Sequence, residues 1–384
     1  MRFLSASVVD TAPLVLDVGV VLLGAATAGY IARRIGLPAI LGYLFVGLVV
    51  SPFTPGYIAD KNQIAILADI GVVLLLFEVG IEIDLRRLRR EQRGIIWGAP
   101  LQVLIGMLIA TPIFLLLDIP RLGALLLALS LAMSSSVVIV NITRSGKRTT
   151  DNGTEEALLG WSVVQDVTGV AAGAIILTLF GANEKPIGIA LGGLLAFVAL
   201  AYVASKVLPQ ILKLIRWETD IFLIYSVGSG LFIAALGTQL FGIPMALASF
   251  VAGLTMSQNS DTDQVRKAVL PFRDLFQVLF FVVIGSLISP TELKSAWPFA
   301  ALLIILLFTL KTLPAFLIAK FAKLKARPGQ LGIGLSQVGE FSFVLGSVAL
   351  AEGALTQTQF TAVLLTVVLS IVISTLWVRS IHRR

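Results

Sequence analysis

The chain has no cysteine, only one histidine and few charges. Without cysteine there can be no disulfide, thiol nucleophile or cysteine-ligated metal. The single histidine, His382, lies next to the C-terminus, so the body of the chain has no imidazole for catalysis. Charged residues make up 13% of the 384, whereas soluble proteins average about 25%. An intramembrane hydrolase would need histidine or metal ligands, so we expect neither an enzyme nor a bound cofactor.

Apolar residues make up 57% of the chain and gather in runs of about twenty, the length at which a helix crosses a bilayer. This pattern predicts an all-α polytopic membrane protein. Glycine, proline and charge clusters separate thirteen expected helices, at about 13–32, 37–52, 64–83, 95–117, 122–143, 155–180, 187–207, 220–241, 243–257, 271–289, 297–319, 329–352 and 359–378.

Lysine and arginine are distributed unequally between the two sides of these spans. Most of the 29 follow odd-numbered spans or lie in the C-terminal tail. The opposite side has only Arg2, Lys61, Arg121, Lys185 and Lys294. Because the basic side faces the cytoplasm, we expect the N-terminus outside and the C-terminus inside. This membrane asymmetry, rather than nucleic-acid binding, explains the net charge of +7.

The two halves of the chain contain a weak internal repeat. LPAILGYLFVGLVVS (37–51) and IPMALASFVAGLTMS (243–257) share proline, leucine, glycine and serine at a constant offset. Nearly the same offset relates Gly80 to Gly285. The offset between the two copies spans seven membrane crossings. Because seven is an odd number, the second copy begins on the opposite side of the membrane. Inverted repeats of this kind are typical of secondary transporters, which bind their substrate near the midplane.

Two polar stretches occupy equivalent positions in the repeats, LAMSSSVVIV (131–140) and GLSQVGEFSF (334–343). Polar clusters at membrane depth are tolerated where they line a cavity or the protein interior. We therefore expect the helices at 122–143 and 329–352 to be broken there and to cross.

Asp166 lies in a long apolar run with no basic residue in the same segment. A charge at the centre of a span costs roughly 2.5–3.5 kcal/mol and marks a functional site by default. Such a carboxylate can hold a proton or a cation, but not both, which is the basis of proton-coupled exchange. The alternative is that Asp166 is only a structural partner of Lys311, an arrangement seldom worth its desolvation cost.

A hard monovalent cation needs several oxygen ligands. Gln165 offers a neutral carbonyl oxygen, and Ser134, Ser135 and Ser136 offer hydroxyls beside the carbonyls that a helix break would free. For each serine, packing through small residues is an equally good interpretation.

Four acidic positions and one lysine complete the membrane charges. Lys311, inside the span at 297–319, is either the counter-charge of Asp166 or compensates the carbonyl ends of the broken helices. Glu340 lies in the second break, where structural pairing is favoured over a place in the ion path. Asp69 and Asp274 are expected to cap equivalent helices. Glu78 has no explanation in the sequence.

Together these stretches resemble the monovalent cation:proton antiporter superfamily, and within it the Kef-type branch. The resemblance rests on ILGYLFVGLVVSP, ILADIGVVLLLFEVGIEID, LAMSSSVVIV, VVQDV, PFRDLFQVLFFVVIG and GLSQVGEFSF, and runs from about 37 to 378. The Gln-Asp pair is fairly specific, because other branches have Asp-Asp or Asn-Asp there.

The resemblance implies a homodimer in the bacterial cytoplasmic (inner) membrane, with the sodium/proton antiporter fold of thirteen helices. The spans within about 95–180 and 297–378 would form an ion-translocating core that moves like an elevator. The first three and the eighth to tenth spans would form the dimerisation scaffold, and the span at 187–207 a linker. Asp166 would alternate between proton and cation, Gln165 and the serines would help hold the ion, and Lys311 would match the family's basic residue. Gln-Asp members are biased toward K⁺, which favours K⁺/H⁺ exchange.

Three features depart from Kef-type sequences. Glu78 replaces an apolar residue, and SSS replaces the more usual SST. Kef-type proteins also commonly continue into a cytoplasmic nucleotide-binding domain, which we do not expect within these 384 residues. A separate cytoplasmic regulatory domain or subunit would then take its place. Na⁺/H⁺ exchange and a ligand-gated potassium channel on the same scaffold are the alternatives. A sodium-coupled organic-anion symporter fits less well, because it predicts fewer spans and no lysine inside one.

Overall fold

The computed structural model describes residues 12–51, 61–82, 91–144, 150–181, 187–257, 262–339 and 341–380. The described residues form helices and connecting loops, with no strand among them. The helices are α1 (Ala12–Arg34), α2 (Ala39–Val49), α3 (Lys61–Glu82), α5 (Arg93–Leu116), α6 (Arg121–Ala132), α7 (Ser136–Arg144), α8 (Asn152–Phe180), α9 (Ile187–Ile215), α10 (Thr219–Phe241), α11 (Met245–Met256), α12 (Thr262–Ser286), α13 (Glu292–Leu307), the π-helical η1 (Phe308–Thr312), α14 (Leu313–Phe321), α15 (Pro328–Gly334), α16 (Phe341–Ala351) and α17 (Gln357–Ser380).

Each expected span contains one of these helices or a broken pair, which confirms an all-α polytopic membrane protein. In the described part of the chain, eight helices are long and apolar enough to cross a bilayer, and four shorter apolar helices accompany them. The total of thirteen crossings stays a prediction. Both expected breaks are present: α6 ends at Ala132 before α7 begins at Ser136, and α15 ends at Gly334 before α16 begins at Phe341.

The internal repeat is visible in how helices α2 and α11 pack. They begin directly after Pro38 and Pro244, the prolines that the repeat pairs. Gly47 of α2 packs so closely on α12 that an added Cβ would lie 2.1 Å from the Val282 carbonyl oxygen. Gly253 of α11 packs on α3 in the same way, 2.0 Å from the Phe77 carbonyl oxygen. The sequence matches therefore correspond to two equivalent backbone-to-backbone crossings.

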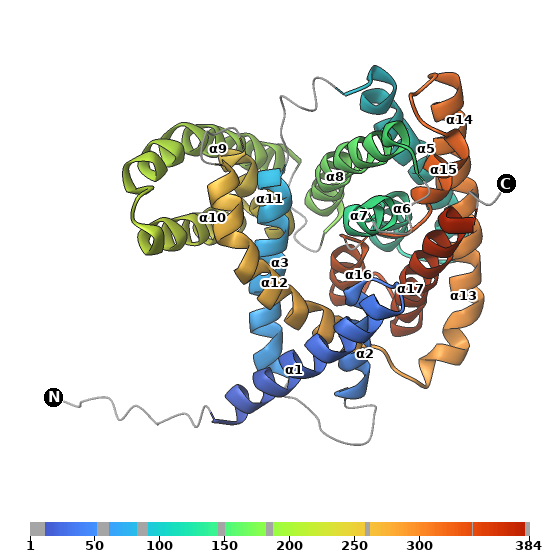
Figure 1. Cartoon of the computed structure of the whole chain (residues 1–384), viewed down its shortest axis with the longest axis horizontal. Coiled ribbons are helices and arrows are strands. Elements are labelled where there is room, and N and C mark those ends of the chain that lie inside the picture. The colour runs from blue at the N-terminus through green and yellow to red at the C-terminus, as the bar shows by residue number, and fades with distance from the viewer. Residues whose placement is uncertain are drawn as a thin grey trace.

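The helices gather into two groups (Figure 1). On one side, α12 and α11 pack against α3, while α9 and α10 pack on α11. On the other side, α5, α6 and α8 pack together with α13 to α17, and α16 lies on α6. The candidate site lies where α3 of the first group faces α8 and α16 of the second.

The expected capping role of Asp69 and Asp274 is wrong. Helix α3 begins at Lys61 and α12 at Thr262, so both carboxylates lie inside helices rather than at their N-termini. Helix α12 starts well before the expected residue 271 and contains Pro271. The apolar run begins near Pro271, but the preceding polar residues continue the helix, so hydropathy alone placed its start too late.

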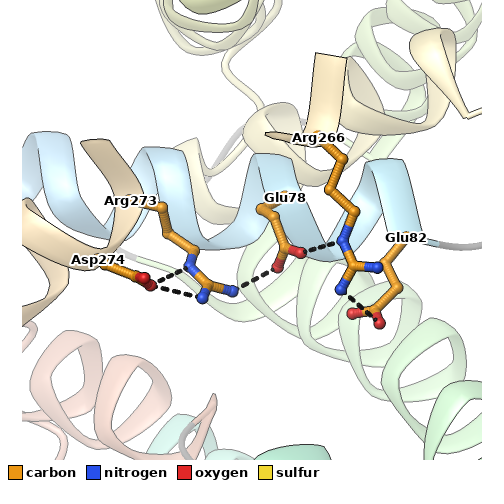
Figure 2. A network of polar contacts seen from close by, with 5 residues as sticks. All are labelled: Glu78, Glu82, Arg266, Arg273 and Asp274. Atoms are coloured by element: carbon orange, nitrogen blue, oxygen red, sulfur yellow. Dashed lines mark hydrogen bonds and ion pairs between the residues drawn. The ribbon is translucent and has the colours of Figure 1, made fainter. Parts of the chain in front are cut away.

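Glu78 is explained by an ion-pair network between α3 and α12 (Figure 2). Its carboxylate, only 2% exposed, accepts from Arg266 on one oxygen and from Arg273 on the other, each at 2.8 Å. Arg266 also binds Glu82 at 2.8 Å, and Arg273 binds Asp274 at 2.6 Å. These bonds fix α3, and α3 forms one wall of the candidate site.

We expect Glu78→Gln to destabilise the protein by roughly 2 kcal/mol. That is below the 3–5 kcal/mol typical of a broken buried pair, because Arg266 and Arg273 are partly exposed and can turn toward water. Thermal unfolding in detergent measures the effect. The control is Glu82→Gln, since the Glu82 side chain is 46% exposed and such pairs contribute about 1 kcal/mol or less. Equal losses in the two variants would show that Glu78 does not tie the network together.

Candidate ion-binding site

Helix α8 carries Asp166 to the middle of the helical core. The helix begins after Asp151, whose side chain accepts from the Thr154 amide at 2.7 Å, and it continues unbroken to Phe180. An N-cap of this kind satisfies one of the unpaired amides of the first turn. Asp166 lies at the midpoint of α8 and is partly buried.

The first broken helix presents its unwound residues to Asp166. Between α6 and α7, the Ser134 hydroxyl donates to the Leu335 carbonyl at 2.9 Å, which ties this break to the second one. The Ser135 hydroxyl accepts from the Val138 amide at 3.3 Å, as an N-cap of α7 would. Ser136 begins α7 and stays partly exposed.

The two breaks cross in backbone contact. The Gly339 amide donates to the Met133 carbonyl at 2.9 Å. A Cβ at Gly339 would lie 2.6 Å from the Ser134 carbonyl oxygen, so only glycine fits without displacing the chain. The Gln337 side chain donates to the Ser135 carbonyl at 3.4 Å.

Lys311 binds main-chain carbonyls of both breaks at this crossing. It lies in η1, is 1% exposed, and its ammonium donates to the Met133 carbonyl at 2.5 Å and the Gln337 carbonyl at 2.6 Å. Of the two roles left open by the sequence, this geometry matches compensation of the carbonyl ends of the broken helices. The charge of Asp166 also acts on Lys311 electrostatically, while the hydrogen bonds of the ammonium go to the main chain.

A small cavity of about 20 Å³ lies at the crossing. Asp166 and Ser134, Ser135 and Ser136 provide its polar lining. The remaining walls come from Leu75, Leu76, Val79, Met133, Val170 and Phe341. A volume of about 10–15 Å³ holds one water, so this space suits a single water or a largely dehydrated ion.

Gln165 lies beside Asp166 but points to a different neighbour. Its amide nitrogen donates to the Ala132 carbonyl at 3.1 Å and to the side-chain oxygen of Gln102 on α5. Its own side-chain oxygen is buried and has no hydrogen-bond partner among the residues that the structure describes. Gln165 thus holds the end of α6, and its role as an ion ligand stays a prediction. Glu340 lies outside the described residues.

Sequence reasoning missed Gln102, which is fully buried. The signal that could have found it is a lone amide in the apolar stretch GAPLQVLIG of α5. A buried amide needs hydrogen-bond partners, and the nearest unpaired groups in such a core are broken helix ends.

A second cavity of about 370 Å³ opens along the same three helices, α3, α8 and α16. Its lining includes Asp69, Thr178, Ser347 and Glu352, together with residues of α10 and α11. Asp69, which caps no helix, therefore faces a large partly polar space. The two cavities follow one another along the seam between the two helix groups.

The chain is similar to known ion exchangers in sequence and in fold. The family described as "Sodium/hydrogen exchanger, transmembrane" matches residues 21–384. The putative cation/proton antiporter YbaL of Escherichia coli strain K12 is 28% identical over 361 residues, which are 90% of this chain and 64% of that protein. The chain thus spans somewhat less than two thirds of that relative's length.

Solved structures of the sodium proton antiporter MjNhaP1 from Methanocaldococcus jannaschii share the fold. The structure at pH 8 has a TM-score of 0.76 at 17% identity, covering 96% of this chain and 98% of that one. An electron-microscopy structure has a TM-score of 0.64 at 16% identity, covering 96% and 95%. These findings confirm the predicted superfamily and antiporter fold: the chain belongs to the sodium/hydrogen exchanger family of membrane proteins.

Proposed function

We propose that this protein exchanges a monovalent cation, K⁺ in the first place, for protons across the membrane. Asp166 is the carboxylate that holds the proton and the cation in turn. The observation that carries the proposal is the small cavity where Asp166 meets the three serines of the α6–α7 break. It combines one titratable group with several neutral oxygens, which is what a hard monovalent cation requires.

Competition for Asp166 couples the two ions. Protonation neutralises the carboxylate and leaves only hydroxyls and carbonyls, which bind a cation weakly. A bound cation in turn stabilises the carboxylate and releases its proton. Each site therefore binds either one proton or one cation at a time. The gradient of one ion then drives the transport of the other ion in the opposite direction.

The position of the cavities between two helix groups supports a mechanism of alternating access. In the elevator proposed here, α5–α8 and α13–α17 are the core that carries the site. Helices α1–α3 and α10–α12 are the scaffold and the homodimer contact, and α9 links the two parts. By the predicted orientation the larger cavity opens to the outside and leads ions toward Asp166. We place the protein in the bacterial inner membrane, surrounded by lipid, with no resident cofactor.

K⁺ is preferred over Na⁺ because of the Gln165–Asp166 pair, which resembles Kef-type members. Na⁺/H⁺ exchange is the second candidate, since the solved structures of similar fold are described as sodium proton antiporters. A cytoplasmic regulatory domain or subunit is a further proposal, because YbaL is longer than the part that this chain matches.

The test is transport by the purified protein in proteoliposomes that contain a pH-sensitive dye. An imposed K⁺ gradient is expected to move protons in the opposite direction, and a Na⁺ gradient to do so less effectively. Equal or greater proton movement with Na⁺ would show that the protein does not prefer K⁺ and would favour Na⁺/H⁺ exchange. Potassium flux without proton movement would favour the ligand-gated channel and overturn exchange.

A further inference from the structure

The Met133 side chain packs directly against the backbone of Gly169 in α8. A Cβ added to Gly169 would lie 2.0 Å from the sulfur of Met133 and 2.2 Å from its terminal methyl carbon. The thioether therefore occupies the space that any side chain at residue 169 would take. Met133 is fully buried and lines the small cavity beside Asp166.

The backbone of Met133 cannot move to relieve such a clash. Its carbonyl oxygen accepts from Lys311 at 2.5 Å and from the Gly339 amide at 2.9 Å, so it is fixed at the crossing of the two breaks. Methionine side chains are flexible and adapt to irregular spaces. A group added at Gly169 would consequently displace the thioether and leave the main chain in place, and the adjoining free space is the ion cavity.

We propose that the contact between Met133 and Gly169 sets the size of the ion cavity and thereby selects among alkali cations. This inference rests on the proposed exchange function. At about 20 Å³ the cavity has little spare room, so displacement of one thioether changes which ion fits. Met133 is a specificity-determining wall of the site, and Gly169 positions it.

The first variant is Gly169→Ala, in which the new methyl group pushes the thioether into the cavity. The apparent affinity for larger ions then falls more than that for smaller ions, and the loss decreases in the order Rb⁺, K⁺, Na⁺, Li⁺. One methylene in a tight pocket changes discrimination about tenfold or more. We expect the ratio of apparent affinities for K⁺ and Na⁺ to fall by about tenfold, measured as half-saturating ion concentrations for proton movement in proteoliposomes.

The matched control is Gly173→Ala, one turn further along α8. A Cβ there would lie 3.4 Å from side-chain carbons of Leu129 and Leu345 and 3.8 Å from the ring of Phe341. These are ordinary van der Waals contacts, so the new methyl group fits without moving Met133 or Phe341. We expect this variant to keep the wild-type K⁺/Na⁺ ratio. A general response of α8 to alanine would change the ratio in both variants and overturn the proposal.

The second variant is Met133→Ala, which removes the thioether, enlarges the cavity and favours Rb⁺ and K⁺. In the double variant the methyl group of residue 169 has no thioether to push, so Gly169→Ala is expected to have little further effect. Non-additivity of this kind shows that two residues act through one contact. A full tenfold effect of Gly169→Ala in the Met133→Ala background would overturn the proposal, as would a ratio unchanged by Gly169→Ala alone.

Failure of this inference can be told apart from failure of the proposed function. If the wild-type protein moves no protons in response to any alkali cation, exchange itself is wrong. If the wild type exchanges ions but the variants keep its selectivity ratios, the exchange function is supported. The proposed role of Met133 in setting the cavity size is then wrong. Size-exclusion and thermal-unfolding profiles of each variant identify any that fails to fold, and the remaining variant then decides.

Discussion

Asp166→Asn is expected to abolish exchange while leaving the protein folded. Asparagine has nearly the same shape as aspartate but neither binds a proton at physiological pH nor carries a charge for the cation. The cavity then keeps its serine hydroxyls and loses the one carboxylate among its described lining residues. Folding should not suffer, because a charge at the centre of a span costs roughly 2.5–3.5 kcal/mol and the amide avoids much of that cost.

The measurement is cation-driven proton movement in proteoliposomes, with thermal unfolding in detergent beside it. We expect transport at the background of protein-free liposomes and a melting temperature equal to the wild type or higher. Asp220→Asn is the matched control, because Asp220 is exposed in the first turn of α10 and should leave transport unchanged. Residual exchange in Asp166→Asn that still depends on the cation gradient would place the carrier carboxylate elsewhere.

Lys311→Met is expected to cause the largest loss of stability. Methionine fills much of the same volume but donates no hydrogen bond, so the carbonyls of Met133 and Gln337 lose the ammonium that both accept from. Each hydrogen bond to a charged group contributes about 1.5–3 kcal/mol, and after the substitution the Met133 carbonyl keeps only the Gly339 amide among its described donors. Removing the buried ammonium recovers part of its own desolvation cost, but it also takes away the cation near Asp166 and the helix ends. We expect a net loss of about 3 kcal/mol, because the two lost hydrogen bonds outweigh the recovered desolvation.

Thermal unfolding of the purified variant measures this loss, and transport should fall with it because the crossing no longer holds its shape. The control is Lys320→Met, the same substitution at an exposed lysine at the end of α14. A melting temperature for Lys311→Met as high as that of Lys320→Met would mean that the ammonium is not needed to hold the two breaks together.

Much of this architecture could be predicted because a bilayer imposes simple rules. Apolar runs, the proline that precedes each repeat-equivalent helix, and the polar stretches at 131–140 and 334–343 located the helices and both breaks correctly. A lone acid such as Asp166 also stands out, because its burial needs a functional reason.

Long-range partners could not be predicted. Glu78 binds Arg266, 188 residues away, across two helices whose relative rotation no local pattern gives. Lys311 binds main-chain carbonyls, which have no side-chain signature. Gln165 turns to Ala132 and Gln102 because α5 lies against α8 at that depth, and sequence spacing along one helix does not report on its neighbour.

The most direct test measures the affinity of the purified protein for K⁺ as a function of pH. If one carboxyl group binds either ion, the apparent dissociation constant for K⁺ should rise tenfold for each unit that pH falls below the carboxyl pKa, and level off above it. The dependence should be absent in Asp166→Asn. An apparent affinity for K⁺ that stays constant over the pH range in which exchange operates would show that proton and cation occupy separate sites, which contradicts competition at Asp166.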